Sequence, residues 1–150
     1  MKEKVIYLID YGIKDELVYQ LGWEFRKKRF VLVPFSPADL IEQLIKNKRK
    51  APIVSIIQYR NHLELSRGFN RRFLNKVISH YQMPYVEFTS FSEIIISDKD
   101  FMLRNKKEFS LPMSLSDIAS VVQNEFEEYF ARDFEWPGGR RGSFKEVRES

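Results

Sequence analysis

Three residues whose side chains could support chemistry stand at the ends of predicted strands. Asp10 follows the apolar run Val5–Ile9, and Thr89 and Ser90 follow a second run that begins at Tyr85. If both runs are parallel strands of one sheet, these residues share the carboxyl edge, where open α/β sheets bind their ligands. A carboxylate near two hydroxyl groups could bind a metal ion or a small molecule. The pattern therefore predicts one candidate site, at the carboxyl edge of a sheet.

Composition excludes several other kinds of active site. The 150-residue chain has no cysteine, which rules out disulfides, thiolate nucleophiles and thiolate metal ligands. Its two histidines, His62 and His80, lie in or beside one predicted helix, with no carboxylate at a triad-like spacing. The chain contains neither a glycine-rich dinucleotide fingerprint nor a Walker sequence. We therefore predict no catalytic residues, no metal site and no cofactor.

Length and charge predict one folded domain outside the membrane. A chain of 150 residues, 43% of them hydrophobic, is long enough to bury a core. The net charge of +4 arises from 25 basic and 21 acidic residues that are mixed along the sequence, whereas nucleic-acid-binding domains concentrate basic residues on one face. The first apolar run is too short for a signal peptide, and no run reaches the roughly 20 residues of a membrane helix. We expect a cytoplasmic protein.

Strand-like and helix-like segments alternate along the chain. Predicted strands cover Val5–Ile9, Phe30–Val33, Pro52–Ile57, Tyr85–Phe88 and a short segment from Glu108 to Leu111. Predicted helices cover Asp15–Arg29, a segment opened by Ser36, part of Asn61–Gln82 and a segment from Ser114 to Arg132. Ser36 and Ser114 are predicted N-caps, each with an acid three residues later. This alternation predicts an α/β fold, a doubly wound five-stranded parallel sheet of order 2-1-3-4-5 with helices on both faces.

Two segments are harder to assign. Within 93–107, Glu93 to Ile96 has strand composition, whereas Asp98 to Lys107 has the pattern of an amphipathic helix, and both interpretations stay open. After Arg132 the helical pattern ends, and a basic stretch rich in glycine and arginine follows. We predict a folded domain over residues 1–132 and a flexible basic tail over residues 133–150.

Thr89 and Pro112 are separated by a suggestive interval. An apolar strand ends at Thr89, a segment of about one helix follows, and a strand–proline–helix junction stands at Pro112. This arrangement resembles the receiver domain of bacterial response regulators, which end their fourth strand in Thr or Ser and their fifth in Lys-Pro. The resemblance covers nearly the whole chain up to Arg132. It implies the flavodoxin-like receiver fold and a role in signal transduction.

The residues that carry receiver chemistry are incomplete here. A working receiver has acids after its first strand, an acceptor Asp after its third, a hydroxyl after its fourth and a Lys after its fifth. Asp10 and Thr89 match, but the acceptor position falls at Gln58 and Tyr59, and Leu111 replaces the Lys. Because the metal and the Lys must neutralise the phosphoryl charge, we expect no aspartyl phosphorylation. The resemblance then implies a degenerate receiver, or pseudo-receiver, with a pocket formed by Asp10, Tyr59, Thr89, Ser90, Leu111 and Pro112.

In receivers, the face made by the fourth helix, fifth strand and fifth helix is the usual dimer or partner surface. The chain has 13 Phe, 7 Tyr and 2 Trp, and aromatic residues together with Arg are enriched in protein interfaces. We expect a protein partner or a homodimer at this face. Its predicted interface residues are Met102, Arg104, Phe109, Phe126, Tyr129 and Trp136. Whether Tyr59 acts as a switch residue stays open.

These observations favour a non-catalytic interaction module in signalling or regulation. Two alternatives stay open. One is a flavodoxin-like small-molecule-binding protein or enzyme that uses Asp10, Thr89 and Ser90. The other is a nucleic-acid-binding regulator that uses the basic tail, in which Arg140 and Arg141 lie between glycines.

Overall fold

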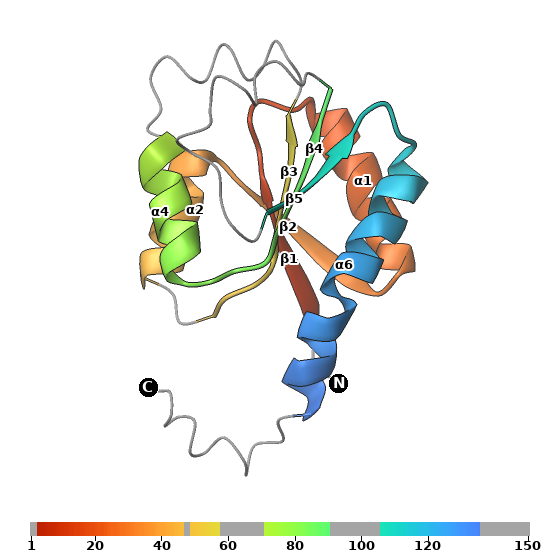
Figure 1. Ribbon diagram of the computed structural model, residues 1–150. Coiled ribbons are helices and arrows are strands. Elements are labelled where there is room, and N and C mark those ends of the chain that lie inside the picture. The colour runs from red at the N-terminus through yellow and green to blue at the C-terminus, as the bar shows by residue number, and fades with distance from the viewer. Residues whose placement is uncertain (1–2, 47–48, 58–70, 91–105, 136–150) are drawn as a thin grey trace.

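Apolar strands alternate with amphipathic helices, and the chain folds into a parallel sheet covered on both faces (Figure 1). The computed structural model describes residues 3–46, 49–57, 71–90 and 106–135. The strands are Lys4–Ile9 (β1), Phe30–Phe35 (β2), Ile53–Ile57 (β3), Tyr85–Thr89 (β4) and Lys106–Ser110 (β5). The described helices are Asp15–Lys27 (α1), Pro37–Lys46 (α2), Arg71–His80 (α4) and Leu115–Glu135 (α6).

The strand order is β2-β1-β3-β4-β5, which confirms the predicted order. All four neighbouring pairs are parallel. Because neighbouring strands run the same way, each connection must cross back over one face of the sheet. The carboxyl ends of all strands therefore meet at one edge, and the amino ends meet at the other.

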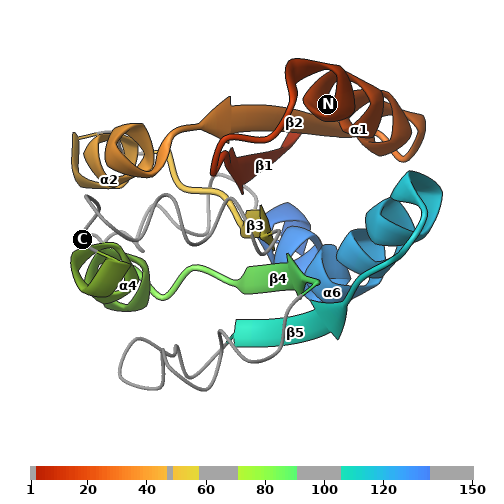
Figure 2. The same cartoon turned by 90° about the horizontal axis from the view of Figure 1, so that it is seen from above.

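The inner strands are apolar because helices cover both of their faces. Every residue of β3 and β4 is buried. One core cluster packs α2 and α4 against one face of the sheet, and a second packs α1 and α6 against the other. Figure 2 shows these three layers from above, with β2 and β5 at the two lateral ends of the sheet. None of the described helices combines the length and the hydropathy needed to span a membrane.

Serine side chains cap two of the helices, as predicted. The Asp39 N–H donates to Ser36 Oγ at 3.2 Å, and the Asp117 N–H donates to Ser114 Oγ at 3.0 Å. Each bond satisfies a backbone donor that the first helical turn leaves without an intrahelical partner. The two helices therefore begin where the Ser-x-x-Asp pattern places them.

Helix α1 runs unbroken through Gly22 and ends in a basic turn. Lys28 is its C-cap. Arg29 then adopts a φ of 68°, in the left-handed region where helices commonly terminate. The chain enters β2 directly afterwards, at Phe30. This tight connection holds the basic end of α1 against the outermost strand of the sheet.

The structure decides the end of the segment that the sequence left open between strand and helix. Lys106 and Lys107 carry the end of an amphipathic helical pattern, yet they are the first two residues of β5. They pair with Tyr85 and Val86 of β4, so pairing with a neighbouring strand outweighs the local pattern. The rest of the ambiguous segment, 93–105, lies outside the described residues, as does the 61–70 part of the predicted third helix.

Two other elements, β2 and α6, extend further than the sequence predicted. Strand β2 continues past Val33 to Phe35, because its pairing with β1 extends to Ile9. Helix α6 continues past Arg132 to Glu135, so the predicted tail begins as helix.

Phe126 is a core residue and not part of a partner surface. Its side chain is 1% exposed and belongs to the cluster between α6 and the sheet. The helical period places it on the buried face of α6, which also carries Ile118, Ala119 and Val122. A partner that docks on the outer face of α6 cannot contact Phe126, which corrects its assignment to the predicted interface.

We expect Phe126→Ala to lower the free energy of unfolding by roughly 3–5 kcal/mol, because it leaves a cavity in a closed core. Urea denaturation followed by circular dichroism measures this loss. Gln123→Ala, an exposed position on the same helix, is the control and should change stability by less than about 0.5 kcal/mol. Equal, small effects of both substitutions would contradict the core assignment.

Candidate functional site

Thr89, Ser90 and Leu111 lie together at the carboxyl edge of the sheet. Thr89 is the last residue of β4, with Ile57 of β3 and Ser110 of β5 as its lateral neighbours. The Ser90 N–H donates to the Ile57 carbonyl at 3.2 Å, and the Leu111 N–H donates to the Thr89 carbonyl at 2.9 Å. These bonds extend the ladder beyond the strands and fix the backbone at the edge. Thr89 is buried there, whereas Ser90 is exposed.

Asp10 lies at the same edge, where its carboxylate closes a turn. Its Oδ1 accepts hydrogen bonds from the backbone N–H groups of Gly12, at 3.0 Å, and Ile13, at 2.8 Å. Gly12 has a φ of 84°, a conformation that glycine adopts readily. This side-chain-to-backbone pattern is typical of aspartate in turns. Asp10 therefore has a structural task that requires no bound ligand.

The described residues beside Thr89 at the carboxyl edge carry no charge. Ile57, its neighbour on β3, is 2% exposed. Leu111 is half-buried and packs against the core cluster of α1 and α6, and a cis peptide bond joins it to the exposed Pro112. Asp10 is separated from Thr89 by the whole of β3, about two strand spacings or about 10 Å. Among the described residues, the edge thus has hydroxyl groups and one distant carboxylate around an aliphatic centre.

This arrangement can hydrogen-bond a ligand, but its described residues do not make a metal centre. No group of three or more acidic or imidazole side chains in the described part of the chain is placed to hold an ion. The Asp10 carboxylate already accepts two backbone hydrogen bonds. The chemistry that Asp10, Thr89 and Ser90 can offer together is therefore polar recognition.

A buried polar network that the sequence analysis missed lies under the site. Glu87 of β4 is 2% exposed, and its carboxylate accepts a hydrogen bond from the Tyr85 hydroxyl at 3.0 Å and lies 3.5 Å from Lys106 Nζ. Because the single Tyr85 hydroxyl proton points to Glu87, the Ser55 hydroxyl, 2.9 Å away, donates to the Tyr85 oxygen. Lys106 Nζ also lies 3.0 Å from Glu108. The network links β3, β4 and β5 across one face of the sheet.

One feature of the sequence could have indicated this network, namely an acidic residue inside a predicted strand. Glu87 interrupts an otherwise apolar run, and Ser55 interrupts the run of β3. A buried acid requires a cation or several donors. Nothing local identifies Lys106 as that cation, because the pairing of β4 with β5 brings the two residues together.

The other predicted site residues are only partly described. Tyr59, Met102, Arg104 and Trp136 lie outside the described residues. Phe109 is half-buried on β5, where its ring stacks on Phe88 with centroids 5.6 Å apart. Tyr129 is half-buried on α6, with its ring centroid 5.2 Å from that of Phe130. Phe109 and Tyr129 thus keep part of their surface accessible, unlike Phe126.

The amino edge of the sheet holds a different cation. Partial desolvation lowers the pKa of the Lys50 amine, which donates a hydrogen bond to the Leu44 carbonyl and lies 4.2 Å from the Tyr81 ring centroid. These contacts hold the start of β3 to the ends of α2 and α4. Lys50 is at the opposite edge from the candidate site and takes no part in it.

Comparison with known proteins identifies the fold. No protein-family model matches the chain, and no curated protein matches its sequence. A response regulator receiver protein from Sinorhizobium medicae is 14% identical with a TM-score of 0.63, covering 84% of this chain and 96% of that one. Full-length FixJ from B. japonicum is 13% identical with a TM-score of 0.59, covering 85% and 60%. The chain therefore has the receiver fold.

The same fold also matches part of an enzyme. The lysine decarboxylase LdcF from Francisella novicida is 16% identical with a TM-score of 0.60, and the match covers 87% of this chain but only 18% of that one. Identities this low establish the architecture alone. What the site does must be argued from its residues.

We expect Asp10→Ala to destabilise the domain by about 1 kcal/mol, because two backbone N–H groups lose their acceptor. Asp10→Asn should cost much less, since the amide oxygen can accept the same bonds. Urea denaturation, repeated with and without Mg²⁺, measures both variants. A stabilisation by Mg²⁺ that the wild type shows and Asp10→Asn lacks would instead make Asp10 a metal ligand.

We expect Lys106→Met to lower stability by roughly 3–5 kcal/mol, because it leaves the buried Glu87 carboxylate without a cation. Glu87→Met should cost less, since Lys106 keeps Glu108 at 3.0 Å. The double variant should recover much of the loss, because an apolar pair can replace a buried ion pair. Thermal and urea unfolding of the double-mutant cycle measure the coupling, and additive effects would show that the pair is energetically unimportant.

Proposed function

We propose that the protein is a receiver-like interaction module that signals without aspartyl phosphorylation. The observation that supports this most strongly is the aliphatic centre of the carboxyl edge. Ile57 lies beside Thr89 where β3 ends, and Leu111 follows β5 where receivers carry their Lys. In the sequence, residues 53–60 include no carboxylate at all. A phosphoryl acceptor and its neutralising cation are thus both missing from the positions that the fold provides for them.

The physical argument concerns charge. A transferring phosphoryl group needs a metal ion, an ammonium group or oriented dipoles to stabilise the charge that develops on its oxygens. Ile57 and Leu111 supply none, and Asp10 would add negative charge about 10 Å away. The hydroxyl groups of Thr89 and Ser90 can donate hydrogen bonds, which is insufficient for the chemistry but compatible with a structural or recognition role.

The proposed mode of action is binding to a protein, either a partner or a second copy. Strand β5 is the outermost strand on its side of the sheet and carries the partly accessible Phe109. Helix α6 beside it carries the partly accessible Tyr129. Met102, Arg104 and Trp136 would complete this surface. The structural likeness to a response regulator receiver protein from Sinorhizobium medicae supports a role in signalling.

We expect a titration with Mg²⁺ and beryllofluoride, a mimic of aspartyl phosphate, to leave the amide NMR spectrum of the full chain unchanged. The reason is that the mimic needs an acceptor carboxylate and a metal site. Ile57→Ala serves as a control for the sensitivity of nearby resonances to small changes at this edge. Saturable shifts around Asp10 and Thr89 would overturn the proposal and favour a small-molecule or metal-binding function.

We also expect Phe109→Ala combined with Tyr129→Ala to weaken self-association or partner capture while the fold remains intact. Analytical ultracentrifugation measures self-association, and affinity purification from the source cells measures capture of a partner. Phe73→Ala, an exposed residue of α4 on the opposite face of the sheet, is the matched aromatic control for this surface. Unchanged association in the double variant would show that β5 and α6 do not form the interface.

A further inference from the structure

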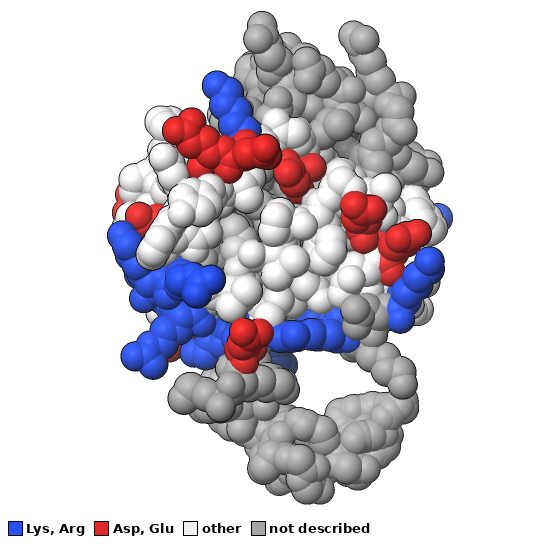
Figure 3. Space-filling view, turned by 180° about the vertical axis from the view of Figure 1, so that it is seen from behind, with Lys and Arg blue, Asp and Glu red and all other residues white. Residues whose placement is uncertain are grey.

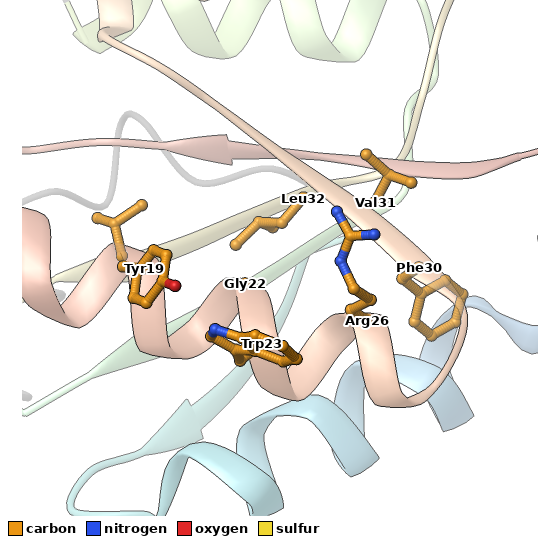
Figure 4. A pocket seen from close by; sticks show the side chains of 8 residues that line it. Tyr19, Gly22, Trp23, Arg26, Phe30, Val31 and Leu32 are labelled. Atoms are coloured by element: carbon orange, nitrogen blue, oxygen red, sulfur yellow. The ribbon is translucent and has the colours of Figure 1, made fainter.

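A groove between α1 and β2 combines exposed aromatic side chains with an open floor. It has a volume of about 450 Å³, and its lining includes Tyr19, Gly22, Trp23, Arg26, Phe30 and Leu32. Tyr19 is 67% exposed and Trp23 is 53% exposed. Figure 4 shows Tyr19 and Arg26 on either side of Gly22, with Leu32 of β2 across from them. Two aromatic side chains of the helix are thus exposed to solvent beside a half-buried strand.

The groove residues of α1 recur at helical spacing. Tyr19, Gly22, Trp23 and Arg26 stand at positions i, i+3, i+4 and i+7, which places them along one stripe of the helix. The core contacts of α1 are made by other residues, led by Leu21 and Phe25. Trp, Tyr and Arg are the residue types most enriched at the energetic centres of protein interfaces. The stripe therefore has the composition of a binding surface.

Gly22 is the most informative residue of the stripe. Glycine inside a helix lowers stability by roughly 0.5–1 kcal/mol relative to alanine. Packing does not require it here, because a Cβ added at Gly22 would meet nothing within 4 Å. The structural consequence of glycine at this position is that the floor of the groove stays open between Tyr19 and Arg26. Gly22 therefore leaves space that a side chain of a binding partner could occupy.

Strand β2 offers a backbone edge along the same groove. It is the terminal strand of the sheet, and no described strand pairs with its outer side. The Phe35 carbonyl accepts the Asp10 N–H at 2.8 Å, so the peptide groups of alternate residues point to β1 and those of Leu32 point outward. Pro34, which has no N–H, stands at an outward position, as prolines in edge strands do. An extended peptide can hydrogen-bond to this edge over a short stretch.

The two ends of the groove carry opposite charge. Asp15 and Glu16 occupy the first turn of α1. Arg26, Lys28 and Arg29 lie at the other end, and Arg26 and Arg29 are exposed. Figure 3, which looks onto the β2 side of the molecule, shows Lys and Arg gathered at its lower left and Asp and Glu mostly at its upper part and right, with uncharged surface between, and a basic side chain also stands at the top. The groove therefore has a direction, from an acidic to a basic end.

We propose that this groove binds a peptide segment of a partner protein that carries a bulky apolar side chain with acidic residues on one side of it. The apolar side chain occupies the open floor over Gly22 and packs against Trp23. The acidic residues lie against Arg26 and Arg29. The peptide runs along β2 and uses its outward peptide groups.

Two other occupants fit the surface less well. A second copy of the chain in a two-fold contact would set the same hollow patch against itself, so that the open floor over Gly22 faces its own copy rather than a projecting side chain. A single-stranded nucleic acid could stack on Trp23 and Tyr19, but its phosphates would run past Asp15 and Glu16 at the acidic end. An apolar peptide with acids on one side matches both the floor and the charge gradient.

This inference is independent of the surface proposed for β5 and α6. Strand β2 and strand β5 are the two ends of the strand order, so the groove and that surface lie at opposite lateral ends of the sheet. Failure of either proposal leaves the other standing.

The test is fluorescence anisotropy of the full chain with labelled synthetic peptides. The probe set holds a central Trp, Phe or Leu flanked on one side by Asp and Glu. Three comparison sets replace the acids with Lys, replace the central residue with Gly, or place acids on both sides. We expect saturable binding of the first set, weaker binding as salt increases, and little or no binding of the Lys and Gly sets.

Variants then locate the site. Gly22→Gln should abolish binding while keeping or raising thermal stability, because it fills the floor without touching the core. Trp23→Ala and Arg26→Glu should each weaken binding by about tenfold or more. Phe73→Ala and Lys76→Glu, which remove an exposed aromatic residue and a cation from α4, are the matched controls and should have little effect.

Three results would overturn the proposal. One is the absence of saturable binding by any acid-flanked peptide. Another is binding that Gly22→Gln and Trp23→Ala leave unchanged, which places the peptide elsewhere. The third is tighter binding of oligo(dT) than of the best peptide at the same salt concentration, which makes the surface a nucleic-acid site.

Discussion

Burial of the parallel sheet on both faces is the constraint on which the rest of the structure depends. Strands β1 and β3 in its centre tolerate only apolar or fully hydrogen-bonded side chains, because α2 and α4 cover one face and α1 and α6 cover the other. Parallel pairing then places all carboxyl ends at one edge. Polar groups with access to solvent can therefore appear at that edge and along the two outermost strands, and both surfaces proposed for binding lie on the outer strands.

The exception inside the sheet shows how strict this constraint is. Glu87 is buried in β4, and it is accommodated by a chain of partners that runs from Ser55 through Tyr85 and on to Lys106. The polar side-chain atoms of these four residues each have a partner at hydrogen-bonding or ion-pair distance, which is the condition for burying such groups. The network joins β3 to β5 just below Thr89. The carboxyl edge thus rests on a polar layer, while the level of Thr89 itself is aliphatic.

Much of the fold followed from local patterns in the sequence. The Ser-x-x-Asp caps at Ser36 and Ser114 specify helix starts, since the side chain and the backbone donor are three residues apart. Apolar runs identified four of the strands and a short segment before Pro112 predicted the fifth, and their alternation with helices predicted the strand order. The pattern left Lys106 and Lys107 open between helix and strand, and they are strand because a short segment at the edge of a sheet is decided by its neighbour.

The sequence by itself determined the fold class, the helix caps and the absence of cysteine chemistry, of an acceptor carboxylate after the third strand and of a lysine before Pro112. These follow from residue types and from spacings of a few positions. Only the tertiary structure decided that Ile57 lies beside Thr89, that Lys106 neutralises Glu87, that Phe126 is buried, and that the stripe around Gly22 faces β2 across a groove. Those relations join residues on different elements, whose register and orientation are set by packing across the whole sheet rather than by any local pattern.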